Sequence, residues 1–349
     1  MISVKSQLER FPVKASAPCR IDSGGTWDIK SMALPFELIR PATINAALSL
    51  RTSVTLSPYK NGFIRISSEG FTHREECPAD KLQLNSVFGI FFAAVSYFGF
   101  HGLEIRISSQ APVKSALGGS STALVALVKA LTALSSTLGG KHLSKKDILL
   151  LAYHLEDAVS GGSCGLQDHA AAVYGGVNYF IWSYGNRKSP FQRYSILDRN
   201  GQKDFSRRLL VAYSGKSHVS SRTNRKWIND FISGKTRKGW MKVNEIVHEL
   251  ADAIKKHDWK LSVDLLQQEM AYRRQITPEA MIPVTAVLLD QAEQAGCGAR
   301  FAGAGAGGSF WALGEKDNID SLRNIWAKTL EGVKGGEVLN TSVDPEGAR

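Results

Sequence analysis

Two carboxylates twelve residues apart, Glu156 and Asp168, are the strongest candidates for chemistry in this sequence. Glu156 lies on the predicted helical face that also carries Leu149 and Tyr153, so its carboxylate faces a largely apolar side. An isolated charge there is costly, and either a divalent cation or a lysine such as Lys145 would relieve that cost. Asp168 either caps a helix or accepts the proton of a reacting hydroxyl. The pair therefore suits a metal-assisted reaction of an alcohol.

A loop rich in glycine and serine, residues 112–122, precedes a strongly helical pattern. Backbone N–H groups at the start of a helix, together with the helix dipole, bind anionic oxygens such as those of phosphate. Gly118 and Gly119 permit positive φ and a close approach of the backbone. Ser120 and Ser121 can either cap the helix or offer a hydroxyl to a phosphate-bound Mg²⁺. The loop indicates phosphate chemistry, with a plain helix cap as the alternative.

A second glycine run, residues 303–308, formally satisfies the G-x-G-x-x-G pattern of dinucleotide-binding proteins. That fingerprint must lie between a strand and a helix, whereas residues 309–313 have the pattern of a strand. A strand, a glycine turn and another strand are therefore expected. The small residues of the turn would let its backbone pack against the loop of residues 112–122 or a bound nucleotide.

Residues 17–28 place an arginine and two carboxylates around a glycine turn. Arg20 suits pairing with phosphate or carboxylate, and Asp28 suits hydrogen bonds to sugar hydroxyls. We interpret His169, next to Asp168, as a structural residue.

The elements that must position these residues follow from hydrophobic periodicity. In the first half, residues 53–56, 63–66 and 103–107 alternate as strands do, and residues 177–182 form a further strand. The apolar run 88–100 is a buried core helix, because it is shorter than the roughly 20 residues of a membrane-spanning helix. A helix follows the loop as far as Gly139, and another begins at Ser144, with Asp147 completing a capping box, and ends at Gly161.

The second half mixes helices and strands, which predicts a second α+β unit. Strands are expected at residues 209–213, 299–302 and 309–313, and helices at 243–256, 261–274 and 284–295. The polar stretch 183–208 marks a domain boundary, which we place near residue 205 to give domains 1–205 and 206–349. The tail from Gly332 is expected to be mobile at its end.

Composition and charge narrow the classes of partner. The 349 residues are 43% hydrophobic and carry a formal net charge of +11, which fits nucleic acid, a membrane surface or small anionic ligands. The basic residues occur in short scattered groups without interleaved aromatics, so neither a nucleic-acid nor a membrane partner is expected. The first ten residues lack the apolar stretch of a signal peptide, and the four cysteines are far apart. We expect a cytoplasmic location with reduced cysteines.

Taken in order, residues 17–28, 112–123 and 303–308 resemble the three motifs of the GHMP kinase superfamily, which includes galactokinase, homoserine, mevalonate and phosphomevalonate kinases. The step from Glu156 to Asp168 and residues 165–176 and 209–221 most resemble its D-glycero-D-manno-heptose 7-phosphate kinase and fucokinase branch. Ala116 departs from the family where the second motif usually starts with glycine, and Gly119 where serine is common. The first motif is one residue shorter than in the heptose kinases and continues unusually into residues 36–41.

The resemblance implies an α+β fold of two domains, the first like domain 2 of ribosomal protein S5 and the second ferredoxin-like, with ATP in the cleft between them. It implies that Asp168 is the catalytic aspartate, that Arg20 lies near the transferred phosphate, and that Glu156 with Ser120 or Ser121 binds Mg²⁺. The implied ATP-binding residues are Pro112, Lys114, Ser115, Leu117, Gly118, Gly119, Ser120, Ser121 and Thr122. The implied acceptor-binding residues are Asp28, Trp27, Gly25, Gly165 and Gly305.

The function implied is ATP-dependent phosphorylation of a sugar or sugar phosphate by a monomer or homodimer. Two alternatives stay open. One is a non-sugar acceptor of the mevalonate or homoserine type, which the polar side chain of Asp28 and the ring of Trp27 disfavour. The other is a catalytically silent nucleotide-binding protein on the same fold.

Overall fold

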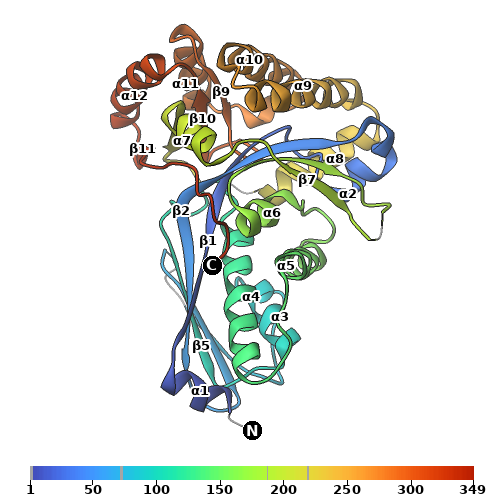
Figure 1. Ribbon diagram of the computed structural model, residues 1–349, viewed down its shortest axis with the longest axis vertical. Coiled ribbons are helices and arrows are strands. Elements are labelled where there is room, and N and C mark those ends of the chain that lie inside the picture. Colours follow the sequence, from blue (N-terminus) through green and yellow to red (C-terminus); the bar gives the residue numbers. More distant parts are fainter. Residues whose placement is uncertain (1–2, 71–73, 187, 218–219) are drawn as a thin grey trace.

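The computed structural model describes residues 3–70, 74–186, 188–217 and 220–349, and its elements form two α+β units (Figure 1). The expectation of an α+β architecture is confirmed. His218 and Val219, at the end of the segment 209–221 used above, lie outside the described residues.

The first unit is built on a seven-stranded sheet in the order β4-β3-β5-β2-β6-β7, with β1 also paired to β2. Its strands are β1 (Val13–Ser23), β2 (Ala42–Pro58), β3 (Phe63–Ser68), β4 (Glu75–Pro78), β5 (Leu103–Ser109), β6 (Val177–Trp182) and β7 (Phe191–Ser195). Strands β3 and β5 pair in parallel, and the other pairs are antiparallel. The register of β1 on β2 shifts between Pro18 and Arg20, an irregularity of the kind that re-aims side chains next to functional sites.

Helices cover one face of this sheet (Figure 1). They are α3 (Gly89–Phe98), α4 (Gly119–Thr137), α5 (Lys145–Ser160) and α6 (Gln167–Tyr174), while α1 (Val4–Arg10), α2 (Lys30–Ala33) and the 3-10 helix η1 (Leu34–Ile39) lie near the strand ends. The capping box predicted at Ser144 and Asp147 is confirmed, and α5 ends at Gly161 with φ of 66°. Helix α4 is long and apolar enough to cross a membrane, but 67% of that stretch is buried inside the protein. The apolar side chains of α4 therefore pack in the core of the protein.

The second unit contains a four-stranded antiparallel sheet in the order β11-β8-β10-β9. Its strands are β8 (Leu209–Ser214), β9 (Gly298–Phe301), β10 (Ser309–Leu313) and β11 (Gly336–Leu339). The helices are α8 (Ser220–Ile232), α9 (Arg237–Lys255), α10 (Trp259–Ile276), α11 (Pro283–Gln294) and α12 (Lys316–Glu331), with the 3-10 helix η2 (Pro278–Ala280). In chain order the strands run 4-1-3-2 across the sheet, which is the ferredoxin-like arrangement that the resemblance implied.

The described part of the polar stretch 183–208 contains β7 and helix α7 (Arg199–Arg207), which the sequence pattern did not reveal. Their strongly polar composition follows from exposure, since four of the five β7 residues are exposed.

The prediction that the C-terminal tail is mobile at its end is wrong. The backbone of Arg349 exchanges two hydrogen bonds with Ser16 of β1, at 2.8 and 3.0 Å. The buried guanidinium of Arg51 pairs with Asp344 and donates to the carbonyl oxygen of Gly347 at 2.8 Å. The C-terminal residues therefore return to the first unit, where Figure 1 shows the chain end beside β1.

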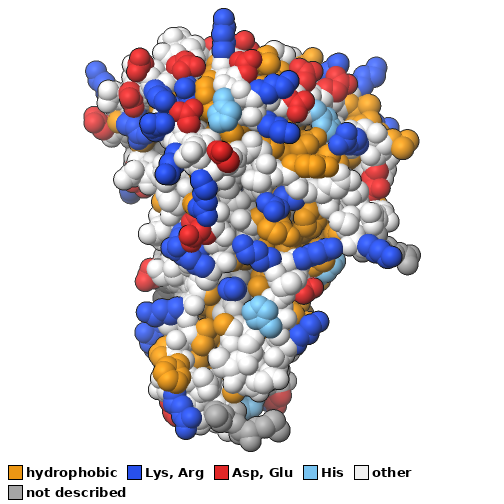
Figure 2. Space-filling view, viewed as in Figure 1, with side chains coloured by type: hydrophobic (Ala, Val, Ile, Leu, Met, Phe, Trp, Pro, Cys, Tyr) orange, Lys and Arg blue, Asp and Glu red, His pale blue; other side chains and the backbone are white. Residues whose placement is uncertain are grey.

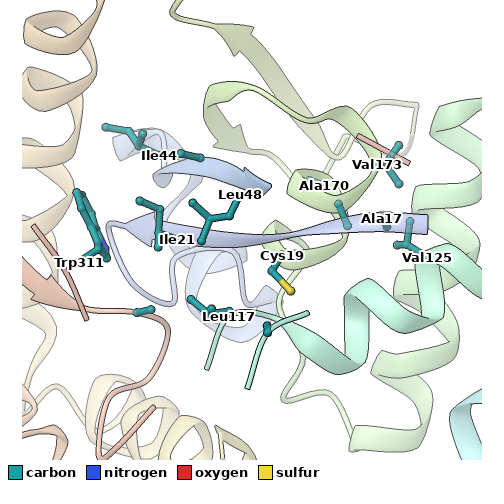
Figure 3. Packing of buried hydrophobic residues seen from close by; sticks show 14 of the residues in the cluster. Ala17, Cys19, Ile21, Ile44, Leu48, Leu117, Val125, Ala170, Val173 and Trp311 are labelled. Carbon is teal, nitrogen blue, oxygen red and sulfur yellow. The ribbon is translucent and has the colours of Figure 1, made fainter. Parts of the chain in front are cut away.

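Strand β1 joins the core to the functional region. Figure 3 shows Cys19 and Ile21 among the packed hydrophobic residues, with Trp311 of β10 at the end of the same strand. Because side chains alternate across a strand, Arg20 and Asp22 point to the other face. The strand thus carries a packed face and a polar, chemically useful face.

Basic side chains are scattered over the surface that Figure 2 shows. Over the end formed by α9 to α12 they are interspersed with acidic side chains, and they form no continuous stripe on this face. The excess of positive charge is thus distributed on this side of the molecule.

Candidate active site

A cavity of about 480 Å³ lies where the glycine-containing segments meet. Its lining includes the apolar side chains of Val87, Phe88, Phe91 and Ile107, which we call the apolar lining. It also includes the loop that leads into α4 and a polar lining made of Arg20, Asp28, Gln167, Asp168 and Asn224. The cavity therefore offers apolar contacts, backbone N–H groups and polar side chains to a ligand.

Arg20 and Asp168 form an ion pair in the polar lining. The Nε of Arg20 donates to Oδ1 of Asp168 at 2.7 Å, and its Nη1 donates to the carbonyl oxygen of Ala116 at 2.7 Å. Both residues line the cavity, and Asp168 is the more accessible of the two, since its side chain is 24% exposed and that of Arg20 is 6% exposed. Burial lowers the pKa of Arg20, but the charges of Asp168 and Asp22 outweigh it and hold the pKa above its usual value. Arg20 is a permanent cation beside this carboxylate.

Glu156 of α5 is held by two serines of α4. Ser120 Oγ donates to Oε1 at 2.5 Å, and Ser121 Oγ donates to Oε2 at 2.6 Å. Nε2 of the fully buried His169 lies 2.7 Å from Oε2. Burial raises the pKa of Glu156, but His169 and the two hydroxyls outweigh it, so the pKa lies below its ordinary value. The carboxylate is anionic. Lys145, named from the sequence as an alternative to a cation, donates instead to the carbonyl oxygen of Glu346 at 3.4 Å.

The loop before α4 is shaped by left-handed backbone. Lys114, Ala116 and Gly118 have φ of 56°, 62° and 76°. The conformation of Ala116 is one that glycine adopts without strain, which explains why the resembling family usually has glycine there. No side chain caps the start of α4, so the first N–H groups of this helix are available to an anion.

The second glycine run packs onto this loop, as predicted. Ser309 N donates to the carbonyl oxygen of Ser115 at 2.8 Å, and a Cβ on Gly308 would lie 2.5 Å from that of Ala116. The run lies between β9 and β10, which confirms the strand, turn, strand prediction. Asp22 fixes its other end by accepting a hydrogen bond from Gly303 N at 2.7 Å.

Asp28 lies at the cavity wall but is already bonded. Its Oδ2 accepts from Gln167 N at 2.9 Å, and its Oδ1 accepts from Gln167 Nε2 at 3.2 Å. A Cβ on Gly165 would lie 1.8 Å from Oδ2, so only glycine fits there. Burial, with the charge of Asp168, raises the pKa of Asp28 to about 8. The structure therefore gives Asp28 a role in fixing the start of α6.

Comparison with known proteins identifies this arrangement. Residues 85–176 match the GHMP kinases N terminal domain, and residues 250–332 match the GHMP kinases C terminal domain. The chain belongs to the GHMP kinase superfamily. The first match contains the second motif, residues 112–123, and the second match contains the third motif, residues 303–308. The first motif, residues 17–28, precedes both matches.

Relatives of this GHMP kinase carry different names. A mevalonate kinase from Thermococcus sibiricus is 24% identical over 369 residues, covering 97% of this chain and 98% of its own. The structure of galactokinase from Lactococcus lactis, complexed with galactose, has a TM-score of 0.74 at 15% identity, covering 99% of this chain and 96% of its own. A D-glycero-D-manno-heptose 1-phosphate kinase from Bacteriodes thetaiotaomicron has a TM-score of 0.70 at 18% identity, covering 97% and 98%. At these identities the structural likeness shows the shared fold.

The donor set of this GHMP kinase fits the ligands that the family uses. Two hydroxyl oxygens and a carboxylate at one helix start suit Mg²⁺, which prefers oxygen ligands. The uncapped start of α4 suits phosphate oxygens, and the apolar lining of the cavity suits a nucleobase.

Most of the predicted site residues of this GHMP kinase meet at the cavity, and four do not. Those that line it are Arg20, Gly25, Asp28, Pro112, Lys114, Ser115, Gly118, Gly119, Ser120, Ser121, Glu156, Gly165 and Asp168. Leu117 is buried in the core, and the hydroxyl of Thr122 donates to Gly118 O at 2.8 Å. Trp27 is also buried and donates to Trp240 O at 3.1 Å, while Gly305 packs against Ala280 and Phe301. Trp27 and Gly305 are thus outside the cavity lining, and contact of either with an acceptor stays a prediction.

Several residues near the cavity of this GHMP kinase are not expected there from the sequence. His169, which we interpret as a structural residue, contacts Glu156. Phe88 and Phe91 belong to the predicted core helix 88–100 and also line the cavity. Gln167, which directly precedes Asp168 in the chain, is hydrogen-bonded to Asp28. The sequence signal for it is its position inside the segment 165–176.

Proposed function

We propose that this protein transfers the terminal phosphoryl group of ATP to a hydroxyl of a small-molecule acceptor of the sugar or sugar-phosphate type. The observation that carries the proposal is the position of the Arg20–Asp168 pair against the loop that begins α4. A Cβ on Gly118 would lie 3.3 Å from the carboxyl carbon of Asp168. The carboxylate thus faces the place where phosphate oxygens would meet the uncapped helix start.

Asp168 acts on the acceptor in this proposal. The acceptor oxygen attacks phosphorus, the bond from phosphorus to the ADP oxygen breaks, and the hydroxyl proton passes to a carboxylate oxygen of Asp168. Proton transfer to a positioned side chain contributes typically about 10² to 10⁴ in rate. Arg20 holds the carboxylate in place and offsets negative charge on the moving phosphoryl group.

Ser120, Ser121 and Glu156 are the residues that would hold Mg²⁺, which supplies charge neutralisation to the phosphate oxygens when bound. The apolar lining of the cavity, from Val87 to Phe91, would receive the adenine. The polar lining would then receive the acceptor.

A sugar-type acceptor is supported by the polar lining of the cavity, where Arg20, Asn224 and Gln167 offer hydrogen-bonding groups. A second candidate, an acceptor of the mevalonate type, is supported by the name of the sequence relatives. It is also supported by the hydrogen bonds from Gln167 that already occupy both oxygens of Asp28, because they leave this side chain less free for sugar hydroxyls.

An acceptor panel scored for ADP release tests both candidates. It contains heptose 7-phosphate, heptose 1-phosphate, fucose, galactose, mevalonate and homoserine, each with ATP and Mg²⁺. Turnover of a sugar or sugar phosphate supports the proposal, and turnover of mevalonate alone replaces it with the second candidate. Saturable ATP binding with no turnover of any acceptor would point to a silent nucleotide-binding protein.

A further inference from the structure

Three different metal-ligating side chains meet at the floor of the cavity. A carboxylate oxygen of Glu156, Sγ of Cys164 and a ring nitrogen of His169 all lie within 4.8 Å of one another. They come from α5, from the loop after it and from α6. Only Glu156 belongs to the residues assigned above to Mg²⁺, so the other two donors are unused by the proposed reaction.

The histidine and the cysteine are available as ligands. His169 is fully buried, and neither of its ring nitrogens has a hydrogen-bond partner among the residues that the structure describes. Nε2 is the nitrogen that faces Glu156, at 2.7 Å from Oε2, and is therefore the one that could share an ion with it. Cys164 is free of disulfide bonds and makes a weak hydrogen bond, from Sγ to Gly165 O at 3.3 Å. An unpartnered nitrogen in a fully buried ring is costly, and a ligand would remove that cost.

The chemistry of this set selects a softer cation than Mg²⁺. Mg²⁺ takes oxygen ligands and keeps near-ideal octahedral geometry, whereas imidazole and thiolate suit Zn²⁺. Around a tetrahedral Zn²⁺, bonds of about 2.3 Å to sulfur and about 2.0 Å to nitrogen place two ligand atoms about 3.5 Å apart. Ligand atoms that lie within 4.8 Å of one another would therefore approach by up to about 1.3 Å for all three to bind one ion.

We propose that Glu156, Cys164 and His169 form a three-ligand Zn²⁺ site, and that Zn²⁺ bound there competes with Mg²⁺ for Glu156. Coordination displaces the thiol proton of Cys164 to solvent, with no change in oxidation state. Because Glu156 and Cys164 line the cavity, the fourth position of the ion opens toward it, where water or a phosphate oxygen can bind. The competition with Mg²⁺ rests on the proposed kinase function, but the binding of Zn²⁺ does not.

Metal binding by the full chain, without nucleotide or acceptor, tests the site directly. Calorimetry with Zn²⁺ measures affinity, and Co²⁺ reports a thiolate ligand through its near-ultraviolet absorption. We expect one tight site per chain with a thiolate band. The variants Cys164→Ser and His169→Gln should each weaken Zn²⁺ binding by at least about 10-fold, and Cys164→Ser should abolish the band. Cys77→Ser, on β4, is the matched control and should bind as the original chain does.

Two results would overturn the site: absence of a thiolate band in the unaltered protein, or unchanged Zn²⁺ affinity in a folded Cys164→Ser variant. Thermal unfolding of each variant checks folding, and Cys164→Ala serves as a second cysteine variant. Competition is measured separately, as inhibition of ADP release by Zn²⁺ that excess Mg²⁺ relieves. Inhibition that excess Mg²⁺ leaves unchanged would overturn the competition, whereas loss of all ADP release would overturn the proposed function and leave the binding result intact.

Discussion

Arg20 Nε and Asp168 Oδ1 lie 2.7 Å apart, although 148 residues separate them in the chain. Arg20 belongs to β1 and Asp168 to the first turn of α6, so the pair joins the sheet to the helix layer. The geometry leaves a fixed, oriented carboxylate at the cavity.

Replacing Asp168 by asparagine should remove the proton acceptor while keeping the shape of the side chain. We expect kcat to fall by about 10² to 10⁴, with nucleotide binding retained. Steady-state ADP release and nucleotide titration measure the two quantities. Asp290→Asn, at an exposed surface pair with Arg274, is the control and should leave kcat unchanged. Turnover of Asp168→Asn near that of the control would exclude the proposed role.

Arg20→Lys tests the positioning of this carboxylate. A lysine cannot reach both Asp168 and the carbonyl oxygen of Ala116, so we expect kcat to fall by about 10² to 10³. Arg274→Lys, at an exposed pair, is the matched control. If Arg20→Lys keeps the kcat of that control, the two-point contact of Arg20 has no part in turnover.

Glu156→Gln should weaken the metal requirement of the reaction. The neutral amide keeps the size of the side chain but loses its negative charge, so the Mg²⁺ concentration for half-maximal rate should rise by about 10-fold or more. Measuring the rate against Mg²⁺ at fixed nucleotide gives this value. Glu293→Gln, at an exposed position of α11, is the control. An unchanged Mg²⁺ dependence would remove Glu156 from the metal site.

Because of Asp28, the free energy of unfolding should fall as pH rises. Its pKa is raised from 3.8 to about 8, chiefly by burial, so the folded protein holds a proton that the unfolded chain releases. The stabilising effect is complete below about pH 4 and is lost as pH rises through about 8. The Asp28→Asn variant does not undergo this loss. The difference in melting temperature, variant minus original protein, should therefore be more positive at pH 9 than at pH 5, by at least about 2 °C. A difference that is the same at both pH values would contradict the raised pKa.

The buried pair of Arg51 and Asp344 should contribute strongly to stability. Both side chains are 9% exposed, and removing one partner strands a buried charge. We expect Asp344→Ala to lower the free energy of unfolding by about 3 to 5 kcal/mol, measured by urea denaturation. Glu346→Ala breaks an exposed pair with Arg349 and should cost about 1 kcal/mol at most. If both variants lowered the free energy of unfolding by the same amount, the buried pair would contribute no more to stability than the exposed one.

The sequence predicted those parts of the fold whose cause is local. The capping residues Ser144 and Gly161 bound α5 because they act on the nearest backbone groups, and the strand at 177–182 has strong period-two patterning. The glycine run at 303–308 could be placed between strands because the pattern of residues 309–313 is local as well.

The missed features depend on distant partners. Nothing near His169 in sequence shows that it would contact Glu156, and the burial of Trp27 follows from contact with Trp240 in the second unit. The tail is expected to be mobile because chain ends usually are, whereas its order comes from Arg51, which lies 293 residues from Asp344. Sequence patterns therefore indicate the glycine loops better than the side chains that surround them.

The return of residues 340–349 to β1 links the folding of the first unit to synthesis of the second. When a ribosome has made residues 13–195, the sheet of the first unit has all its strands, but Arg51 still lacks Asp344. Contacts over such long separations form late, because the chain entropy of closing the loop must be overcome first. The first unit would therefore be completed only after the chain of the second has been made.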